Sequence, residues 1–378
     1  MTINLTGRID SSNAAETEAK INEQIGDYSG ELILDASGLE YISSAGLRVI
    51  LRLKKANAET KVVNCNSEVY EIFDMTGFTE MMDISKAYRK LSVEGCEVIG
   101  EGANGIVYRT DPDTIVKVYK NPDSLDEIHN ERELARKAFV MGIPTAIPYD
   151  VVQVGDLYGS VFELLNAKSF SKLIAEGGDI DELAKESVDI LKTIHSTMLK
   201  DGELPSKSEE AIGWAEYVKP HLPEEIGEKL LSLFKDIPET NNMLHGDYHI
   251  KNIMQQNGEN LLIDMDTLSM GHPVFEFAAI FAAYVGFSCV DKENSANFLG
   301  IKREQCEDFW KYTVKYYFEG EEQEKVDSII RMVETICYAR LLRWISRHND
   351  ALRFGDQVVA FCKDYLIENV PKIDKLYF

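Results

Sequence analysis

A short run in the second half of the sequence combines residue types that could move a phosphoryl group. It reads His245-Gly246-Asp247-Tyr-His249-Ile-Lys-Asn252, and an apolar run ending in Asp264 follows it. A carboxylate can orient a hydroxyl group and accept its proton, and carboxylate and amide oxygens are ligands for Mg²⁺. Asp247 precedes Asn252 by five residues, as in the catalytic loop of kinases. We therefore predict that Asp247 is catalytic, that Asn252 and Asp264 bind magnesium, and that His245 is structural.

A glycine-rich run lies far upstream of this loop. Gly100, Gly102, Gly105 and Val107 form a G-x-G-x-x-G-x-V pattern. Glycines let the backbone approach phosphates closely, so that free N–H groups can bind their oxygens. The run lies between two β-like segments and does not open a helix, which favours a kinase glycine loop over a dinucleotide-binding turn. These residues are predicted to bind ATP.

Two charged residues are predicted to complete the nucleotide site. Lys117 lies in the β-like run Ile115–Val118, where it could clamp the α- and β-phosphates. The following helical segment must supply a glutamate to hold it. Glu131 shares a face with the apolar residues and is favoured over Glu133, which stays open as an alternative. The apolar run before Leu165 could pair with adenine through the carbonyl of Glu163 and the amide of Leu165.

The surrounding elements divide the chain into three parts. Residues 1–88 alternate β-like runs with amphipathic helical runs, which predicts a small α/β domain. Residues 92–165 are β-rich, and residues 166–378 are mostly helical, with a β-like interruption from Asn252 to Asp264. A β-rich lobe followed by a helical lobe places a shared site in the cleft between them. The helical segment from about Arg303 onward is expected to shape the acceptor pocket.

Together these motifs resemble the aminoglycoside phosphotransferase/choline kinase family over roughly residues 92–330. The match includes His-Gly-Asp where protein kinases have His-Arg-Asp, and the Ile263–Asp266 run where they have Asp-Phe-Gly. The resemblance implies an α+β bilobal protein-kinase-like fold, with a β-rich N-lobe and a helical C-lobe, that uses ATP and Mg²⁺. His249 replaces a lysine usual in serine/threonine kinases, and this favours a small hydroxyl-bearing acceptor. Glu276 stands where the family often has aspartate, which keeps the charge with altered reach.

The N-terminal α/β part resembles a STAS domain, as in anti-sigma-factor antagonists. The resemblance rests on Leu32–Asp35, Tyr41–Leu47 and Met75–Phe78. In that family a serine at the start of a helix is the phosphorylated switch, and Ser44 aligns best with it. The resemblance therefore implies Ser44 as a possible phosphoacceptor and a protein partner for this domain. Ser44 is also predicted to be the N-cap of a helix beginning at Ala45, a purely structural role.

The net charge, the cysteine spacing and the length of the apolar runs restrict the kinds of partner that we expect for this protein. The formal net charge of −24 disfavours nucleic acid, because it repels phosphate backbones. The six cysteines lack metal-site spacing, and the run Phe277–Val290 is short for a membrane span and is predicted to be a buried helix. A cytoplasmic protein with no membrane partner is therefore expected. The C-terminal aromatic residues are predicted to be core by their helical spacing; they are Trp310, Tyr312, Tyr316, Tyr317 and Trp344.

Three functions stay open at this point. The first is an active kinase acting on a hydroxyl group, most simply of a small molecule. The second is a kinase that phosphorylates a STAS serine, either Ser44 or one on a partner. The third is an ATP-binding, partner-switching module without turnover, which the presence of Asp247 disfavours.

Overall fold

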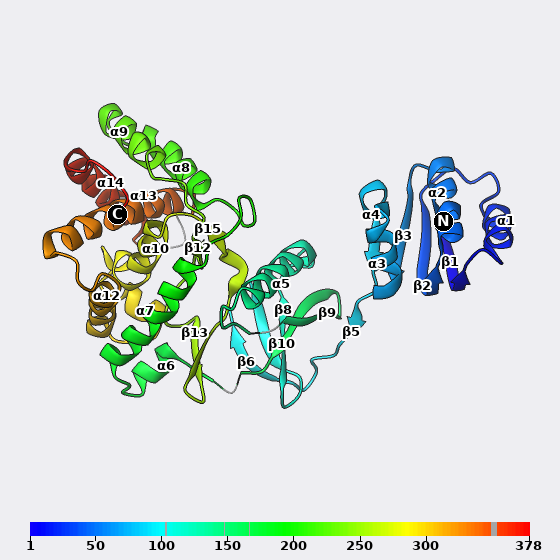
Figure 1. The fold of residues 1–378 in the computed structure, drawn as a ribbon, viewed down its shortest axis with the longest axis horizontal. Helices are drawn as coiled ribbons and strands as arrows, with labels where there is room; N and C mark the ends of the chain where they lie inside the picture. The colour runs from blue at the N-terminus through cyan, green and yellow to red at the C-terminus, as the bar shows by residue number, and fades with distance from the viewer. Residues whose placement is uncertain (103, 147, 166, 349–353) are drawn as a thin grey trace. The chain divides into compact units, whose positions relative to one another are not determined.

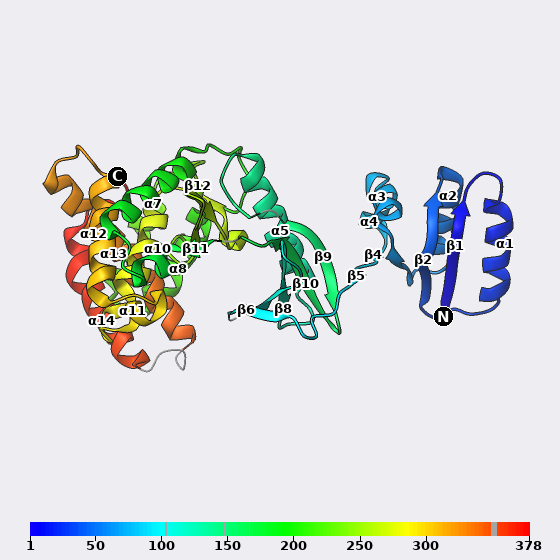
Figure 2. The same cartoon turned by 90° about the horizontal axis from the view of Figure 1, so that it is seen from below.

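The computed structural model describes residues 1–102, 104–146, 148–165, 167–348 and 354–378, and its elements are drawn in Figures 1 and 2. The chain forms two compact units. One contains Met1–Gly95 with Val151–Gly159, and the other contains Cys96–Asp150 with Ser160–Phe378. In the part of the chain that is described, no helix is both long and apolar enough to cross a membrane.

The N-terminal domain is built on a parallel sheet of order β1-β2-β3-β4. Parallel neighbours require crossover connections, and the helices between the strands supply them. Apolar side chains alternate along the strands, and Leu32, Leu34 and Val62 are fully buried in a core that Ile50 and Phe73 complete. The elements are β1 (Thr2–Ile9), α1 (Ala14–Ile25), β2 (Leu32–Ile42), α2 (Ser44–Ala56), β3 (Thr60–Cys65), α3 (Ser67–Met75), α4 (Phe78–Met81) and β4 (Ile84–Lys86).

The start of helix α2 corrects one prediction by a single residue. Ser43, not Ser44, is the N-cap: its backbone is extended, and its hydroxyl accepts a hydrogen bond from the Ala45 amide at 3.2 Å. An N-cap residue keeps a non-helical backbone while its side chain satisfies a free amide of the first turn. Ser44 is therefore the first residue of the helix, and its side chain is exposed.

A second sheet forms the β-rich lobe, with strand order β5-β9-β10-β8-β7-β6. The hairpin of β6 and β7 flanks the glycine run, and Val107 on β7 lies opposite Lys117 on β8. Helix α5 follows β8 and presents Ile128, Glu131 and Leu134 to the interior. The elements are β5 (Arg89–Lys90), β6 (Glu97–Glu101), β7 (Gly105–Arg109), β8 (Thr114–Tyr119), α5 (Leu125–Val140), β9 (Pro148–Val154) and β10 (Leu157–Glu163).

The rest of the chain forms a helical lobe around one large apolar core. Helix α13 packs against α8, α10 and α14, and α7 packs against α12. The helices are α6 (Phe170–Ala175), α7 (Ile180–Ser196), α8 (Lys207–Val218), α9 (Glu224–Lys235), α10 (Val274–Tyr284), α11 (Asn294–Leu299), α12 (Arg303–Tyr317), α13 (Gln323–Arg347) and α14 (Gly355–Asn369). The short strands are β11 (Lys168–Ser169), β12 (Met243–Leu244), β13 (Ile253–Gln256), β14 (Glu259–Leu262) and β15 (Ser269–Met270).

Two expectations for this lobe have different outcomes. The buried helix predicted over Phe277–Val290 is present only up to Tyr284, as the end of α10, which is buried on nearly all sides as its continuous apolar sequence requires; residues 285–290 lie outside it and include a short 3-10 turn. The prediction that the C-terminal aromatic residues are core holds for Trp310 and Tyr317, whose rings contact Phe277. It is wrong for Trp344, which is 40% exposed near the end of α13.

Candidate active site

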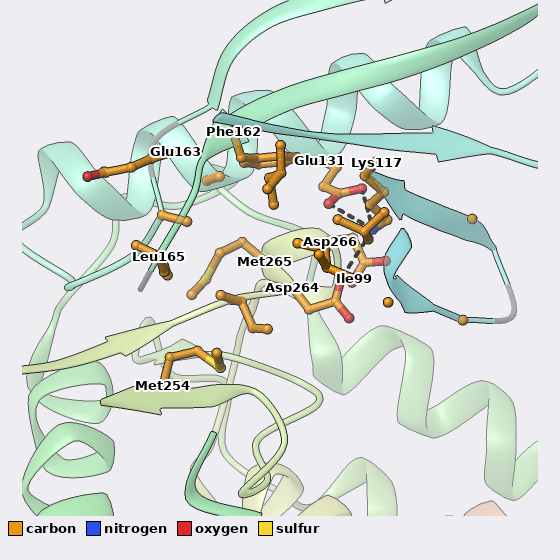
Figure 3. A pocket seen from close by; sticks show the side chains of 18 of the residues that line it. Ile99, Lys117, Glu131, Phe162, Glu163, Leu165, Met254, Asp264, Met265 and Asp266 are labelled. Carbon is orange, nitrogen blue, oxygen red and sulfur yellow. Dashed lines mark hydrogen bonds and ion pairs between the residues drawn. The ribbon is translucent and has the colours of Figure 1, made fainter. Parts of the chain in front are cut away.

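The predicted nucleotide residues line one cleft of about 510 Å³. Its walls come from the β6–β7 hairpin, β8, α5, the end of β10 and the segment after β14 (Figure 3). The predicted ATP-binding residues all border it; they are Gly100, Gly102, Gly105, Val107, Lys117, Glu131, Glu163 and Leu165. The predicted magnesium ligand Asp264 borders it as well, whereas Asp247 and Asn252 are not among its lining residues.

Gly105 and Gly102 of the glycine-rich loop differ in whether the surrounding protein requires a glycine at their position. A Cβ atom on Gly105 would lie 2.7 Å from the Val118 carbonyl oxygen, so the close packing of β7 on β8 requires glycine there. A Cβ atom on Gly102 would meet no atom within 4 Å, and its φ angle is not positive. Nothing in the described protein therefore requires glycine at position 102. A ligand that approaches the backbone closely would require it.

Lys117 lies between two carboxylates at the back of the cleft. Its Nζ atom is 3.0 Å from Glu131 Oε1 and 3.2 Å from Asp264 Oδ1 (Figure 3). Burial lowers the pKa of Lys117, but these carboxylates outweigh that effect and hold the pKa above its ordinary value. Glu131 is buried and also accepts a hydrogen bond from the Tyr119 hydroxyl. The expected ion pair with Glu131 is present, and the alternative residue, Glu133, instead pairs with Lys137 on α5.

The segment after β14 contributes two acidic residues, Asp264 and Asp266, to the lining of the cleft. Asp264 follows β14 in a left-handed conformation, with a φ angle of 65°, and its side chain is 45% exposed to the cleft. Burial and the nearby charges of Asp264 and Glu131 raise the pKa of Asp266 to about 6. The sequence analysis did not select Asp266. The signal for it was the repeated acid in Ile263–Asp266, where only the first aspartate has a counterpart in the kinase motif.

The segment after β10 forms a further wall of the cleft with Phe162, Glu163, Leu164 and Leu165. The Leu164 amide donates a hydrogen bond to the Asp113 carbonyl at 2.7 Å and is therefore directed away from the cleft. Successive residues of an extended chain alternate their orientation, so the groups on either side of Leu164 are the ones available to a ligand. That the Glu163 carbonyl and the Leu165 amide pair with adenine stays a prediction.

The loop that carries Asp247 is held by side chains from within the same motif. The Asn252 Nδ2 atom donates hydrogen bonds to the Asp247 carbonyl at 3.0 Å and to its carboxylate at 3.2 Å. The His249 Nε2 atom lies 3.4 Å from the same carboxylate. Burial raises the pKa of Asp247, but the hydrogen bond from His249, with the charges of His245 and Arg340, lowers it to about 2. Asp247 is therefore a carboxylate at neutral pH, able to accept a proton.

Glu276 supports this loop from the first turn of α10. It is fully buried, accepts hydrogen bonds from the His245 and Gly246 amides at 2.5 and 3.0 Å, and lies 3.9 Å from His195. Gly246 has a φ angle of 85°, and a Cβ atom there would lie 2.4 Å from the Thr267 carbonyl oxygen. The local fold thus explains the glycine of His-Gly-Asp, because no other residue fits. The His245 ring is fully buried, which lowers its pKa, and its Nδ1 atom accepts a hydrogen bond from the Asp247 amide at 3.4 Å.

The donor set fits a magnesium ion. Asp247 accepts hydrogen bonds from the Asn252 amide nitrogen, which leaves the Asn252 side-chain oxygen available to a cation, and the Asp264 carboxylate borders the nucleotide cleft. Within the described residues, no cluster of three or more histidine, cysteine, aspartate or glutamate side chains could hold a metal by itself. Magnesium typically binds through one or two protein ligands together with phosphates and water, and this arrangement matches that pattern.

The fold is kinase-like. A β-rich lobe carries a glycine hairpin and the Lys117–Glu131 pair, and the helical lobe that follows it in sequence carries the loop with Asp247 and Asn252. Residues 95–301, more than half of the chain, match the family described as "Phosphotransferase enzyme family", and residues 1–91 match the STAS domain. The chain therefore belongs to the phosphotransferase enzyme family and carries an N-terminal STAS domain.

Individual relatives agree with both assignments. The N-terminal part is 32% identical over 87 residues to the putative anti-sigma factor antagonist BtrV of Bordetella bronchiseptica, covering 22% of this chain and 75% of the relative. The fold is similar to aminoglycoside phosphotransferase APH(4)-Ia, with a TM-score of 0.52, 13% identity, and coverage of 73% of this chain and 93% of that one. A thermostable mutant of that enzyme in complex with AMP-PNP and hygromycin B gives the same TM-score, with 13% identity and coverage of 74% and 94%.

Proposed function

We propose that this protein is an ATP- and Mg²⁺-dependent phosphotransferase that transfers the γ-phosphate to a hydroxyl group of a small molecule. The observation that carries the proposal is Asp247, a half-exposed carboxylate kept ionised and held by Asn252 on the loop of a phosphotransferase-family fold. A positioned carboxylate of this kind is what phosphoryl transfer to a hydroxyl requires.

The nucleotide is assigned to the cleft of about 510 Å³. Lys117, fixed by Glu131, would bind the α- and β-phosphates, and the Glu163 carbonyl and the Leu165 amide would pair with adenine. The β6–β7 hairpin would cover the phosphates with Gly102 at its turn. The AMP-PNP complex of the APH(4)-Ia mutant supports nucleotide binding in this fold.

Asn252 and Asp264 would hold Mg²⁺. The ion supplies positive charge against the phosphate oxygens of the nucleotide. Five acidic residues border the cleft, whereas Lys117 is its single basic residue in the described part of the chain; the acids are Glu101, Glu131, Glu163, Asp264 and Asp266. A polyphosphate would add further negative charge there, so binding it without a cation would be strongly opposed.

The reaction forms one bond and breaks one. The acceptor oxygen attacks the γ-phosphorus, the bond from that phosphorus to the β,γ-bridging oxygen breaks, and ADP leaves with the electron pair. The acceptor proton passes to the Asp247 carboxylate, which the low pKa keeps ready as a base or hydrogen-bond acceptor.

The test is Asp247→Asn, with Asp236→Asn as a control on an exposed position outside the site. Mg²⁺-dependent ADP formation over a panel of alcohols should fall by about 10²–10⁴-fold in Asp247→Asn and stay unchanged in Asp236→Asn. The affinity for magnesium AMP-PNP, measured by calorimetry, should stay near the wild-type value in both variants. Equal turnover by wild type and Asp247→Asn would refute the catalytic assignment, and nucleotide binding without transfer would favour a partner-switching module.

A second candidate acceptor is Ser44 of the STAS domain. Its hydroxyl is exposed at the first residue of α2, while Ser43 performs the capping, so modification of Ser44 leaves the cap in place. A phosphate at a helix N-terminus is favoured electrostatically and would present new charge to a protein partner of this domain.

Incubation with γ-labelled ATP and peptide mass spectrometry would test this acceptor. Label should appear on Ser44, disappear in Ser44→Ala and in Asp247→Asn, and persist in Ser43→Ala. Equal label on wild type and Ser44→Ala would exclude Ser44 as the acceptor.

A further inference from the structure

A further cavity of about 450 Å³ is bordered by Asp247, the residue predicted to be catalytic. Its walls come from helices α10, α11 and α13 and from the segment that joins α10 to α11. Aromatic rings of Phe287, Phe298 and Trp344 line it, and the first two meet edge to face at 5.8 Å. Three alanines of α10 give it a smooth apolar wall. A largely apolar body would therefore fill most of this space.

Arg340 of α13 is the one basic residue among the described residues that line this cavity, and Asp247 is the one acid. Its guanidinium lies 5.4 Å from the ring centre of Trp214. Within the described chain it makes no hydrogen bond or ion pair; the nearby Glu210 is instead paired with Lys207 at 2.7 Å. A half-buried guanidinium with several unused donors is a site for a carboxylate or phosphate, which it can bind in a bidentate manner.

The charges of the cavity disfavour a polycation. A ligand with several ammonium groups needs several carboxylates, and the described lining offers only Asp247, which the proposed reaction uses for the hydroxyl group. Arg340 would repel such a ligand. Lys251 does not border the cavity, but its ammonium lies 5.1 Å from the ring centre of the lining residue Phe298 and adds positive charge nearby. Repulsive charge of this kind selects against a ligand class even where the overall net charge of the protein attracts it.

We propose that the acceptor is a hydroxy acid with an apolar body, whose hydroxyl group meets Asp247 and whose carboxylate pairs with Arg340. This inference rests on the proposed phosphotransferase function and names its substrate class. Asp247 and Arg340 border the same cavity of about 450 Å³, so one small acceptor can reach both, with its hydroxyl group at Asp247 and its carboxylate at Arg340. The product is the phosphate monoester of the hydroxy acid, formed with ADP.

The experiment uses the full chain and four probes. They are 3-hydroxydecanoate, its neutral methyl ester, the corresponding amine 1-aminodecan-3-ol, and the polycation kanamycin. Turnover is followed as ADP formation, and binding is followed by tryptophan fluorescence in the presence of magnesium AMP-PNP, because Trp344 lines the cavity. The acid should exceed the ester and the amine by about 10–100-fold in kcat/KM or in affinity, the range of one charge-assisted hydrogen-bonded pair.

Three variants test whether Arg340 causes the preference for the hydroxy acid. Arg340→Met keeps the apolar stem and should remove the preference for the acid while leaving the affinity for magnesium AMP-PNP unchanged. Arg340→Lys restores a point charge and should recover part of the preference. Arg347→Met removes an exposed arginine from the end of the same helix and should behave as wild type.

The outcomes separate this inference from the proposed function. Efficient phosphorylation of kanamycin or the amine, unaffected by Arg340→Met, would retain the phosphotransferase and overturn the hydroxy acid. The absence of any preference for the acid, in binding and in turnover alike, would also overturn it. Preferential binding of the acid that depends on Arg340, without ADP formation, would support the pocket assignment and refute the proposed catalysis.

Discussion

The two cavities of the kinase-like unit differ in how their charges are arranged. The nucleotide cleft is rich in acids and holds its single described cation, Lys117, between Glu131 and Asp264. The second cavity is mostly apolar, with Asp247 and an Arg340 that has no ion pair in the described chain. The first arrangement suits a ligand that arrives with its own metal ion, and the second suits a ligand that arrives with its own anion.

Removing the cation of the cleft should give the largest effect on nucleotide affinity and should affect one cavity only. Lys117→Met loses a charge-assisted contact worth about 1.5–3 kcal/mol, so the affinity for magnesium ATP should fall by about 10–100-fold. The preference among acceptors should be unchanged, because Lys117 does not border the second cavity. Lys137→Met, on the exposed face of the same lobe, is the matched control. A changed acceptor preference in Lys117→Met would mean that the two cavities do not act independently.

Two glycine substitutions should separate folding from binding. Gly246→Ala places a Cβ atom against the Thr267 carbonyl at a positive φ angle and should lower the free energy of unfolding by about 1–3 kcal/mol. Gly102→Ala meets no protein atom, so its free energy of unfolding should stay within about 0.5 kcal/mol of wild type. Its affinity for ATP should nevertheless fall. Urea unfolding and calorimetry measure the two quantities, and normal ATP affinity in Gly102→Ala would contradict the role of this glycine.

The smallest effect should come from Asp266 of the nucleotide cleft, as a pH-dependent change in stability. The pKa of Asp266 is raised in the folded protein from 3.8 to about 6, so the fold favours its protonated form. Stability therefore falls as the pH rises through this range and the proton is lost. Asp266→Asn, which stays neutral, should match wild type near pH 4 and exceed it in melting temperature above about pH 6. A difference that does not change with pH would show that the carboxylate is not destabilised by its neighbours.

The nucleotide side of the site was predictable because its signals are local. The spacing of Asp247 and Asn252, and the shared face of Glu131 with apolar neighbours on one helix, can be read from a few residues of sequence. The N-cap of α2 was predicted one residue too late, since Ser43 and Ser44 are equally good caps by residue type and only the backbone conformation distinguishes them.

The acceptor side was not predictable in the same way. Arg340 and Trp344 lie on a long helix that also carries many core residues, and their spacing does not distinguish a cavity wall from a packed interior. Which helix faces Asp247 depends on the packing of α10, α11 and α13, for which the sequence carries no short motif. Asp266 was missed because its raised pKa arises from burial and from the charges of Asp264 and Glu131, and neither its burial nor the approach of the distant Glu131 can be read from the local sequence.

Helix α10 has a consequence for how this protein can change its substrate over evolution. Its first turn carries Glu276, which holds the backbone of the catalytic loop, and its later turns carry Ala279, Ala282 and Ala283 of the cavity wall. A rigid helix transmits any shift along its length, so a larger side chain at the alanines would also displace the loop. New specificities should therefore be acquired through substitutions in α11 and α13. Substitutions in α10 are constrained both by the contact of Glu276 with the catalytic loop and by the alanines of the cavity wall.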